Sequence, residues 1–243
     1  LISVNNILSI NTFLLTMHQK VKTNGAFVGS FSPLEQDYKR LQHKMPRFLY
    51  TLIGPIHFIL FRIFPKIPII SIIYDFITQG KGRYLSKAEV YGRLSYCGFK
   101  LLDSVLIDHQ LFFIAIRKKS VSNESNPSYG PLVKLKRIGY QNRIFVTYKF
   151  RTMHPYSEFI QKEVFEKNNL TTTGKFNDDF RITSWGKIMR KLWIDELPQI
   201  FNWLQGDLTL IGVRALSKQY FSLYPKDLQE LRIKVKPGLI PPY

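Results

Sequence analysis

The sequence has very little cysteine and few acidic residues. Cys97 is the single cysteine among 243 residues, which excludes an intramolecular disulfide and a zinc site built from several cysteines. The chain therefore suits a reducing compartment such as the cytoplasm. Only 17 Asp and Glu residues oppose 35 Lys and Arg residues, and the resulting formal charge of +18 predicts a polyanionic partner. Nucleic acid, anionic lipid headgroups and phosphorylated substrates all qualify.

A long apolar run is also missing. Residues 48–78 are rich in Ile, Leu and Phe, but prolines and charged residues interrupt them. The longest charge-free part, Phe48–Phe61, is about 14 residues long, whereas a straight membrane span needs about 20. Three interpretations remain open: a buried core segment of a soluble domain, a re-entrant or interfacial helix pair flanked by cations, and a full span. The N-terminus lacks the pattern of a secretory signal.

Changes in composition and the positions of turn-forming residues divide the chain into five segments. In order, these are an N-terminal segment of unknown role (1–47), the apolar segment (48–78), a small α+β unit (84–119), a linker rich in Ser and Asn (120–129) and a domain that carries the chemistry (130–243). The chain begins with Leu1 rather than Met and ends without the signs of a natural terminus. We therefore expect a fragment, truncated at the C-terminal end of its last domain.

The small α+β unit has clear helix and turn signals. Ser86 is expected to cap a helix that runs through Leu94, with Glu89 at the capping-box position. Gly98 follows as a helix stop, and the turn at Asp108-His109 separates two short strands. The strands are expected at Lys100–Ile107 and Gln110–Ile116.

The last domain begins with two expected strands, Leu132–Leu135 and Arg143–Met153, separated by a turn. Period-two alternation places Lys149 and Arg151 on one face of the second strand, about 7 Å apart. Two cations at that spacing can serve two phosphates of a diphosphate, or they can simply line a solvated face. The fold class that we predict is α+β: a small mixed or antiparallel sheet with amphipathic surface helices, preceded by an apolar helical segment and the small α+β unit.

Two amphipathic helices are expected downstream. The first begins at Thr183 or Ser184 and carries Arg190 among its basic residues. Its apolar face comprises Trp185, Ile188, Met189 and Leu192, and that of the second helix comprises Leu197, Ile200, Phe201 and Leu204. The first face can lie on an anionic membrane, or frame a phosphate site, or belong to the core.

Adjacent carboxylates open the second helix. Asp195 lies at or near the N-cap, a common position for Asp that needs no catalytic role. The helix N-terminus and the nearby cations would also keep it ionised, so that it could attack phosphorus and form an acyl phosphate. Glu196 can hold a divalent metal that neutralises a diphosphate. Arg214, which follows a short expected strand, can clamp a phosphate or the nucleotide.

Several collinear blocks together resemble the bacterial sugar transferase family, the monotopic polyprenyl-phosphate phosphoglycosyl transferases. The resemblance covers Gly130 to Gly238, and its blocks are Gly130-Pro131-Leu132, Lys136-Arg137-Ile138-Gly139, Tyr148-Lys149-Phe150-Arg151-Thr152-Met153, Asp178-Asp179-Phe180-Arg181-Ile182-Thr183, Asp195-Glu196-Leu197-Pro198-Gln199, Gly206-Asp207-Leu208-Thr209-Leu210-Ile211-Gly212 and Lys236-Pro237-Gly238.

The resemblance implies a two-step reaction. Asp195 would attack the β-phosphate of a nucleoside-diphosphate sugar, and polyprenyl phosphate would then accept the phosphosugar. Glu196 would bind Mg²⁺, while Lys149, Arg151, Arg190 and Arg214 are our candidates for substrate phosphate. The product would start capsule, exopolysaccharide or O-antigen assembly at the cytoplasmic face of the bacterial inner membrane, with an anionic membrane surface as a further partner.

Two departures and one alternative accompany the resemblance. Val213 and Ala215 flank Arg214 where the family usually has prolines, and the apolar segment ends about 50 residues before the place of the family's re-entrant helix. The alternative is a non-catalytic basic protein that binds membranes or nucleic acid. The sequence contains no recognised nucleic-acid motif, so no nucleic-acid partner is expected.

Overall fold

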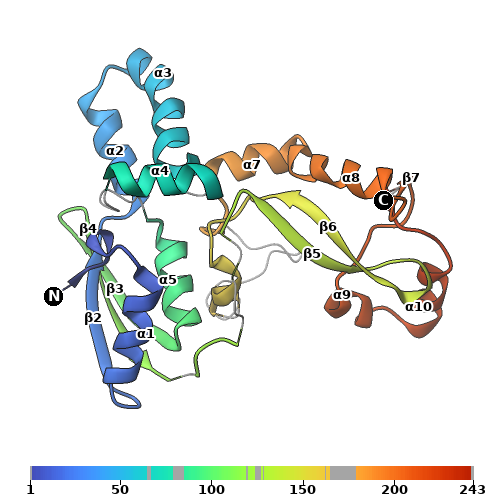
Figure 1. Cartoon of the computed structure of the whole chain (residues 1–243), viewed down its shortest axis with the longest axis horizontal. Helices are drawn as coiled ribbons and strands as arrows, with labels where there is room; N and C mark the ends of the chain where they lie inside the picture. The colour runs from blue at the N-terminus through green and yellow to red at the C-terminus, as the bar shows by residue number, and fades with distance from the viewer. Residues whose placement is uncertain are drawn as a thin grey trace. The chain divides into compact units, whose positions relative to one another are not determined.

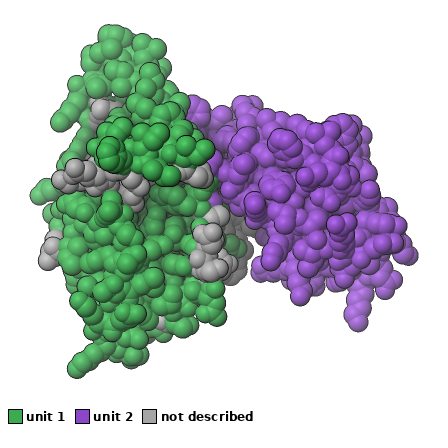
Figure 2. Space-filling view, viewed as in Figure 1, with its two compact units in different colours: residues 1–130, 153–182 green, residues 131–152, 183–243 purple. Residues whose placement is uncertain are grey.

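The chain forms two compact units in the computed structural model. Unit 1 comprises Leu1–Gly130 and Met153–Ile182, and unit 2 comprises Pro131–Thr152 and Thr183–Tyr243 (Figure 2). The structure describes residues 2–64, 67–78, 85–118, 120–123, 127, 129–161, 163–164 and 179–241. The observed mixture of helices and small sheets confirms the predicted α+β class.

Unit 1 contains a four-stranded mixed sheet of order β1-β2-β4-β3 (Figure 1). Strands β1 and β2 are parallel and are connected through α1, whereas β4 is antiparallel to both of its neighbours. The bounds are β1 Ile2–Ser3, η1 Val4–Asn6, α1 Ile10–Lys20, β2 Ala26–Phe31, α2 Leu34–Lys44, α3 Arg47–Phe58, η2 Ile59–Ile63, α4 Pro68–Thr78, α5 Lys87–Tyr96, β3 Phe99–Ile107, β4 Gln110–Arg117 and η5 Ser157–Ile160.

The first 47 residues share this sheet with the predicted small α+β unit. Ala26 through Phe31 pair with Ile116 through Leu111, so the two segments form one body instead of separate domains. The local signals of the small unit are confirmed: Ser86 Oγ accepts from the Glu89 backbone N–H at 3.2 Å, and Gly98 has a φ of 86°. The sequence did not indicate that β2 would pair with the second edge of β4.

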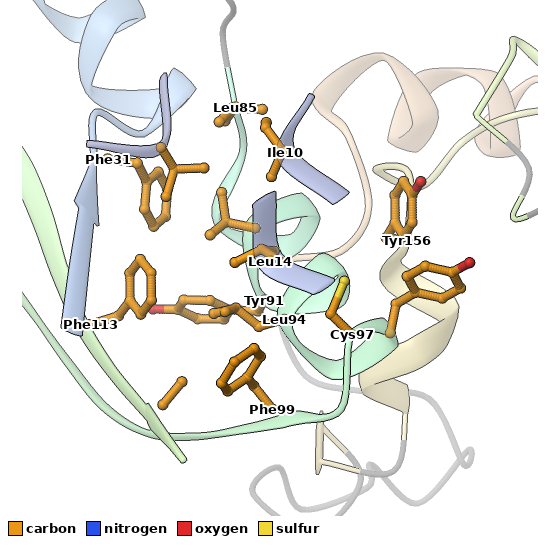
Figure 3. Close-up of a cluster of buried hydrophobic side chains, with 14 of the residues drawn as sticks. Ile10, Leu14, Phe31, Leu85, Tyr91, Leu94, Cys97, Phe99, Phe113 and Tyr156 are labelled. Carbon is orange, nitrogen blue, oxygen red and sulfur yellow. The ribbon is translucent and has the colours of Figure 1, made fainter. Parts of the chain in front are cut away.

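Helices α1 and α5 supply the core of unit 1 together with the sheet (Figure 3). Leu14 and Leu94 are buried against Phe99 and Phe113 from the strands. The core also holds polar groups, because the buried Arg93 donates to Glu89 Oε1 from both Nε and Nη2. Burial raises the pKa of the Cys97 thiol to about 12, so this cysteine is protonated and unreactive at neutral pH.

The apolar segment 48–78 folds into α3, the π-helical turn η2 and α4, and most of its large apolar side chains are exposed. Phe76 is 86% exposed and Ile69 is 76% exposed. The interpretation as a buried core segment is therefore wrong. Among the residues that the structure describes, no helix is both long enough and apolar enough to cross a membrane.

Unit 2 is built on the antiparallel hairpin β5–β6 (Figure 1). Its elements are β5 Leu132–Ile138, η4 Tyr140–Asn142, β6 Ile144–Phe150, α7 Ser184–Lys191, η6 Ile194–Gln199, α8 Ile200–Leu204, β7 Thr209–Ile211, α9 Lys218–Ser222, α10 Lys226–Ile233 and β8 Gly238–Ile240. Strands β7 and β8 pair in parallel, and a Cβ on Gly238 would overlap the backbone nitrogen of Gly212. The Pro-Gly block near the end of the chain therefore depends on glycine for close packing.

Candidate active site

The hairpin β5–β6 forms one wall of the candidate site. Arg137 lies opposite Phe145, and Lys149 lies opposite Val133. Since directly opposed residues of an antiparallel pair share a face, Arg137 and Lys149 project on the same side as the buried Thr147. Helix η6 packs against β6. The hairpin thereby brings cations toward the segment that carries Asp195 and Glu196.

The start of α7 is fastened to the end of β6 through Thr152. Helix α7 begins at Ser184, one of the two predicted start residues, and Thr183 is its N-cap, because the Thr183 Oγ1 accepts from the Gly186 backbone N–H at 2.8 Å. The Thr183 backbone N–H donates to Thr152 O at 2.9 Å. A Cβ on Gly186 would overlap that same carbonyl oxygen, so glycine permits the close approach. Arg190 Nε donates to Thr152 Oγ1 at 2.9 Å.

The segment with the two carboxylates begins differently from the prediction. Trp193 is the N-cap, in the left-handed region with φ of 59°, and Asp195 is the second residue of a 3-10 helix, η6. The α-helical part, α8, starts only at Ile200. Pro198 lies inside η6, where it cannot donate a backbone hydrogen bond. The expected single amphipathic helix is thus a 3-10 turn followed by a short α-helix.

Asn202 joins α8 to β6, a role that no local sequence signal indicated. Its side chain is fully buried, donates from Nδ2 to Val146 O at 2.7 Å and accepts from the Tyr148 backbone N–H at 3.2 Å. One amide therefore satisfies a donor and an acceptor in the middle of the strand. This link fixes the helix that follows Asp195 and Glu196 against the strand that carries Lys149.

We expect Asn202→Ala to lower the free energy of unfolding by about 2 to 4 kcal/mol, because it leaves the Val146 carbonyl and the Tyr148 N–H buried without partners. Urea denaturation followed by tryptophan fluorescence measures the change. Gln205→Ala, an exposed amide just beyond α8, is the matched control and should unfold like the parent protein. Equal midpoints for the two variants would show that the Asn202 bonds contribute nothing.

Glu196 is the centre of a charged cluster. Its Oε1 accepts from Lys149 Nζ at 2.5 Å and from Arg214 Nη2 at 3.1 Å, and its Oε2 accepts from Gln199 Nε2 at 3.2 Å. The Glu196 and Lys149 side chains are each about one fifth exposed, while that of Arg214 is 63% exposed. The structure thus brings together three of the predicted residues, from β6, from η6 and from the loop after β7.

Asp195, the residue before Glu196, is buried to 9% exposure. Within the described part of the chain, no side-chain hydrogen bond or ion pair engages its carboxylate. A carboxylate that retains its acceptor sites can bond to an incoming group. The Asp195 carboxylate is therefore largely shielded from solvent, and its oxygens are available to form a new bond, as a nucleophile requires.

Arg137 belongs to the same cluster, although the sequence marked it only as one residue of a family motif. Burial lowers the pKa of its guanidinium, Arg214 lowers it further, and Glu196 raises it. Arginine nevertheless stays charged near neutral pH. Three cations then accompany the two neighbouring carboxylates, which leaves positive charge available for a phosphate. Period-two alternation places Arg137 on the same face of β5 as Leu135, and this pattern was the signal that could have identified it.

Other predicted phosphate ligands have different surroundings. Arg190 contacts Thr152, and the Arg151 backbone N–H donates to Pro131 O at 2.7 Å at the end of the hairpin. Their participation in substrate binding stays a prediction. Arg232 lies in α10, and its Nη2 donates to Arg214 O at 2.6 Å. It supports the backbone of a cluster residue.

The apolar faces of α7 and of η6–α8 are open to solvent. Exposed fractions are 61% for Leu192, 64% for Phe201 and 69% for Leu204. Trp185, Ile188 and Leu197 are also exposed. The interpretation of the α7 face as core is therefore wrong, and packing within unit 2 accounts for neither apolar face.

The two carboxylates suit a magnesium ion that is completed by substrate. Among the described residues, no group of three or more His, Cys, Asp or Glu side chains could hold a metal ion. Mg²⁺ commonly binds through only one or two carboxylates plus phosphate oxygens and water. Asp195 retains its acceptor sites, and Glu196 Oε2 accepts from Gln199 while both cations bond to Oε1. The donor set fits such an ion.

Comparisons with known proteins show which family the chain resembles. A family model described as bacterial sugar transferase matches residues 99–242, which begins earlier than the predicted resemblance and includes β3 and β4. The galactosyl transferase CpsE of Streptococcus agalactiae is 41% identical over 112 residues, 45% of this chain and 25% of that protein. The exopolysaccharide production protein ExoY of Sinorhizobium fredii is 32% identical over 134 residues, 53% of this chain and 57% of that protein.

A third relative is named for a lipid-linked reaction. The undecaprenyl-phosphate galactose phosphotransferase of Salmonella typhimurium is 34% identical over 109 residues, 43% of this chain and 23% of that protein. The chain thus spans less than two thirds of the length of each of these three relatives. Since the family model matches more than half of its residues, the chain belongs to the bacterial sugar transferase family.

Proposed function

We propose that this protein transfers a sugar 1-phosphate from a nucleoside-diphosphate sugar to polyprenyl phosphate. The observation that carries the proposal is the pairing of Glu196 with Lys149 and Arg214 beside a buried Asp195 that keeps its acceptor sites. Relatives named as undecaprenyl-phosphate sugar phosphotransferases support the same reaction class. The product would enter the synthesis of a surface polysaccharide.

In the first step, an Asp195 carboxylate oxygen attacks the β-phosphorus. A bond forms between that oxygen and phosphorus, the bond from phosphorus to the bridging oxygen breaks, and the nucleoside monophosphate leaves with the bonding electron pair. Lys149 and Arg214 lie where they can shift from Glu196 to the phosphate oxygens and stabilise the developing charge. Arg137 adds a third cation to this environment.

In the second step, an oxygen of polyprenyl phosphate attacks the same phosphorus. The acyl phosphate bond breaks, which regenerates the Asp195 carboxylate and yields the polyprenyl diphosphate sugar. When bound by Asp195 and Glu196, Mg²⁺ would neutralise negative charge on the diphosphate. The protein itself holds the Asp195 carboxylate out of bulk water and positions Lys149 and Arg214.

The lipid acceptor requires access to a membrane. The exposed apolar faces of α7 and η6–α8, with Lys187, Arg190 and Lys191 on the remaining surface of α7, fit the interfacial region of an anionic bilayer. We further propose that the reaction takes place at the cytoplasmic face of the bacterial inner membrane. The alternative of a non-catalytic basic protein is not favoured, because the family and its named relatives are transferases.

The test measures release of nucleoside monophosphate from a panel of UDP-sugars, with Mg²⁺ and a short polyprenyl phosphate in detergent micelles. We expect release with at least one sugar, its loss when EDTA removes the metal, and formation of a lipid-soluble phosphosugar. Polyprenol without its phosphate is the matched acceptor control and should yield no lipid product. Absence of both products with every sugar nucleotide would refute the proposed function.

A further inference from the structure

The helices α2, α3 and α4 of unit 1 lie outside the matched family region, and they present an apolar surface of their own. On α3, Phe48, Leu52 and Ile56 recur every four residues and are 67%, 67% and 57% exposed. The exposed apolar residues of α4 are Ile69, Ile72, Ile73, Phe76 and Ile77. Their spacing of three and four residues places them on a single face of that helix.

The opposite sides of these helices are already occupied. Aromatic rings form a row across the group: Tyr38 of α2 lies 5.9 Å from His57 of α3, and His57 lies 4.5 Å from Phe61 of η2, between ring centroids. Phe61 in turn lies 6.4 Å from Tyr74 of α4. The row gives the helices an inner side, so their exposed apolar faces form an outer surface. Exposed apolar faces with so many large side chains mark an interaction site.

The charge around this surface favours a lipid partner over a protein one. Residues 34–78 contain six Lys or Arg against three Asp or Glu, and none of the acidic residues lies between 38 and 74. Lys39, Arg40 and Lys44 are exposed on α2, and Arg47 is exposed at the start of α3. Helix α2 contacts α3, so the helix that carries three of these cations adjoins one that carries part of the apolar surface (Figure 1). An apolar face bordered by cations complements the acyl chains and headgroups of an anionic bilayer.

We propose that α2, α3 and α4 of unit 1 are a lipid-docking surface that rests in the interfacial region of an anionic membrane. The helices lie on the bilayer instead of crossing it, with the outer residues of α3 and α4 among the upper acyl chains. The cations of α2 and Arg47 contact the headgroups. The proposal does not depend on the catalytic activity, because these residues belong to unit 1, whereas Asp195 and Glu196 belong to unit 2.

A fluorescent probe at residue 76 tests the proposal in the full chain. Cys97 is fully buried, so a cysteine introduced by Phe76→Cys can be labelled selectively with the polarity-sensitive dye NBD. The matched control is Leu8→Cys, at an apolar residue of unit 1 that is 59% exposed and outside the three helices. Vesicles of phosphatidylcholine with one third phosphatidylglycerol serve as the membrane, and spin-labelled lipids serve as quenchers.

We expect the probe at residue 76 to brighten, shift to shorter wavelength and become quenched by the spin-labelled lipids, while the probe at residue 8 stays water-like. If the protein binds the vesicles and the probe at residue 76 stays water-like, the proposal is wrong. It is equally wrong if the protein does not bind, or if the shift occurs without lipid as protein concentration rises, since the surface would then bind a second copy.

The contribution of charge is measured with the same probe. Arg40→Gln with Lys44→Gln should weaken binding to the anionic vesicles about fivefold for each cation removed. The control pair, Lys100→Gln with Lys118→Gln, removes two exposed cations from elsewhere in unit 1 and should leave the titration nearly unchanged. Equal weakening by both pairs would assign the effect to net charge and overturn the role of α2.

Discussion

Asp195→Asn should lower release of nucleoside monophosphate by about 10⁴-fold or more, while the protein remains folded. The amide has nearly the size of the carboxylate but lacks the charge and nucleophilicity needed to form a bond to phosphorus. No described side chain depends on Asp195 for a hydrogen bond, so the substitution removes little structural support. Single-turnover measurement with a radiolabelled sugar nucleotide follows both the released nucleotide and any phosphosugar retained by the protein.

The matched control is Asp227→Asn, which neutralises an exposed carboxylate of α10 in the same unit. It should retain the turnover of the parent protein. Labelled protein should accumulate in the parent when polyprenyl phosphate is omitted, and should be absent in Asp195→Asn. Turnover by Asp195→Asn within tenfold of the parent would require another nucleophile.

Glu196→Gln should lower the rate of the chemical step by about 10²- to 10³-fold without weakening the binding of nucleoside diphosphate. The substitution keeps the size of the side chain but removes the charge that Lys149 and Arg214 share. Without the Glu196 charge, Lys149 and Arg214 neutralise the phosphates of a bound nucleoside diphosphate more fully, so the affinity for this ligand does not fall. The bound Mg²⁺, in contrast, loses an anionic ligand, so the chemical step slows. The Mg²⁺ concentration needed for half-maximal rate should therefore rise.

Two measurements separate this role from a purely structural one. Titration with UDP gives the ground-state affinity, and the rate as a function of Mg²⁺ gives the metal requirement. Glu230→Gln, another neutralised glutamate on α10, controls for net charge and should change neither quantity. A parallel fall in rate and UDP affinity with an unchanged Mg²⁺ requirement would indicate that Glu196 only organises the two cations.

The local elements of this protein could be predicted from its sequence, because their signals involve neighbouring residues. The start of α7 at Ser184 and the turn between β5 and β6 required only spacing and side-chain type. The site itself joins distant residues: Lys149 and Glu196 are 47 positions apart, and Tyr148 and Asn202 are 54 apart. Asn202 looked like an ordinary polar helix residue, since nothing local showed that β6 would cover it.

The N-terminal half shows the same limit. The strand β2 was not predicted, because its partner β4 begins more than 80 residues later and only pairing across the sheet reveals the match. The exposed faces of α3, α4, α7 and α8 have the periodicity of helices that pack in a core. Periodicity identifies an apolar face, but the surrounding fold decides what it contacts.

The contact between Gly212 and Gly238 limits the variation that this protein can accept. Every amino acid other than glycine carries a Cβ, and a Cβ on Gly238 would lie far inside van der Waals contact with the Gly212 backbone nitrogen. No amino-acid replacement at position 238 is therefore compatible with the close approach of the two glycines beside the parallel pair β7–β8. Exposed positions such as Asp227 and Glu230 of α10 have no such steric limit, so sequence change in this unit should concentrate on its surface and spare this junction.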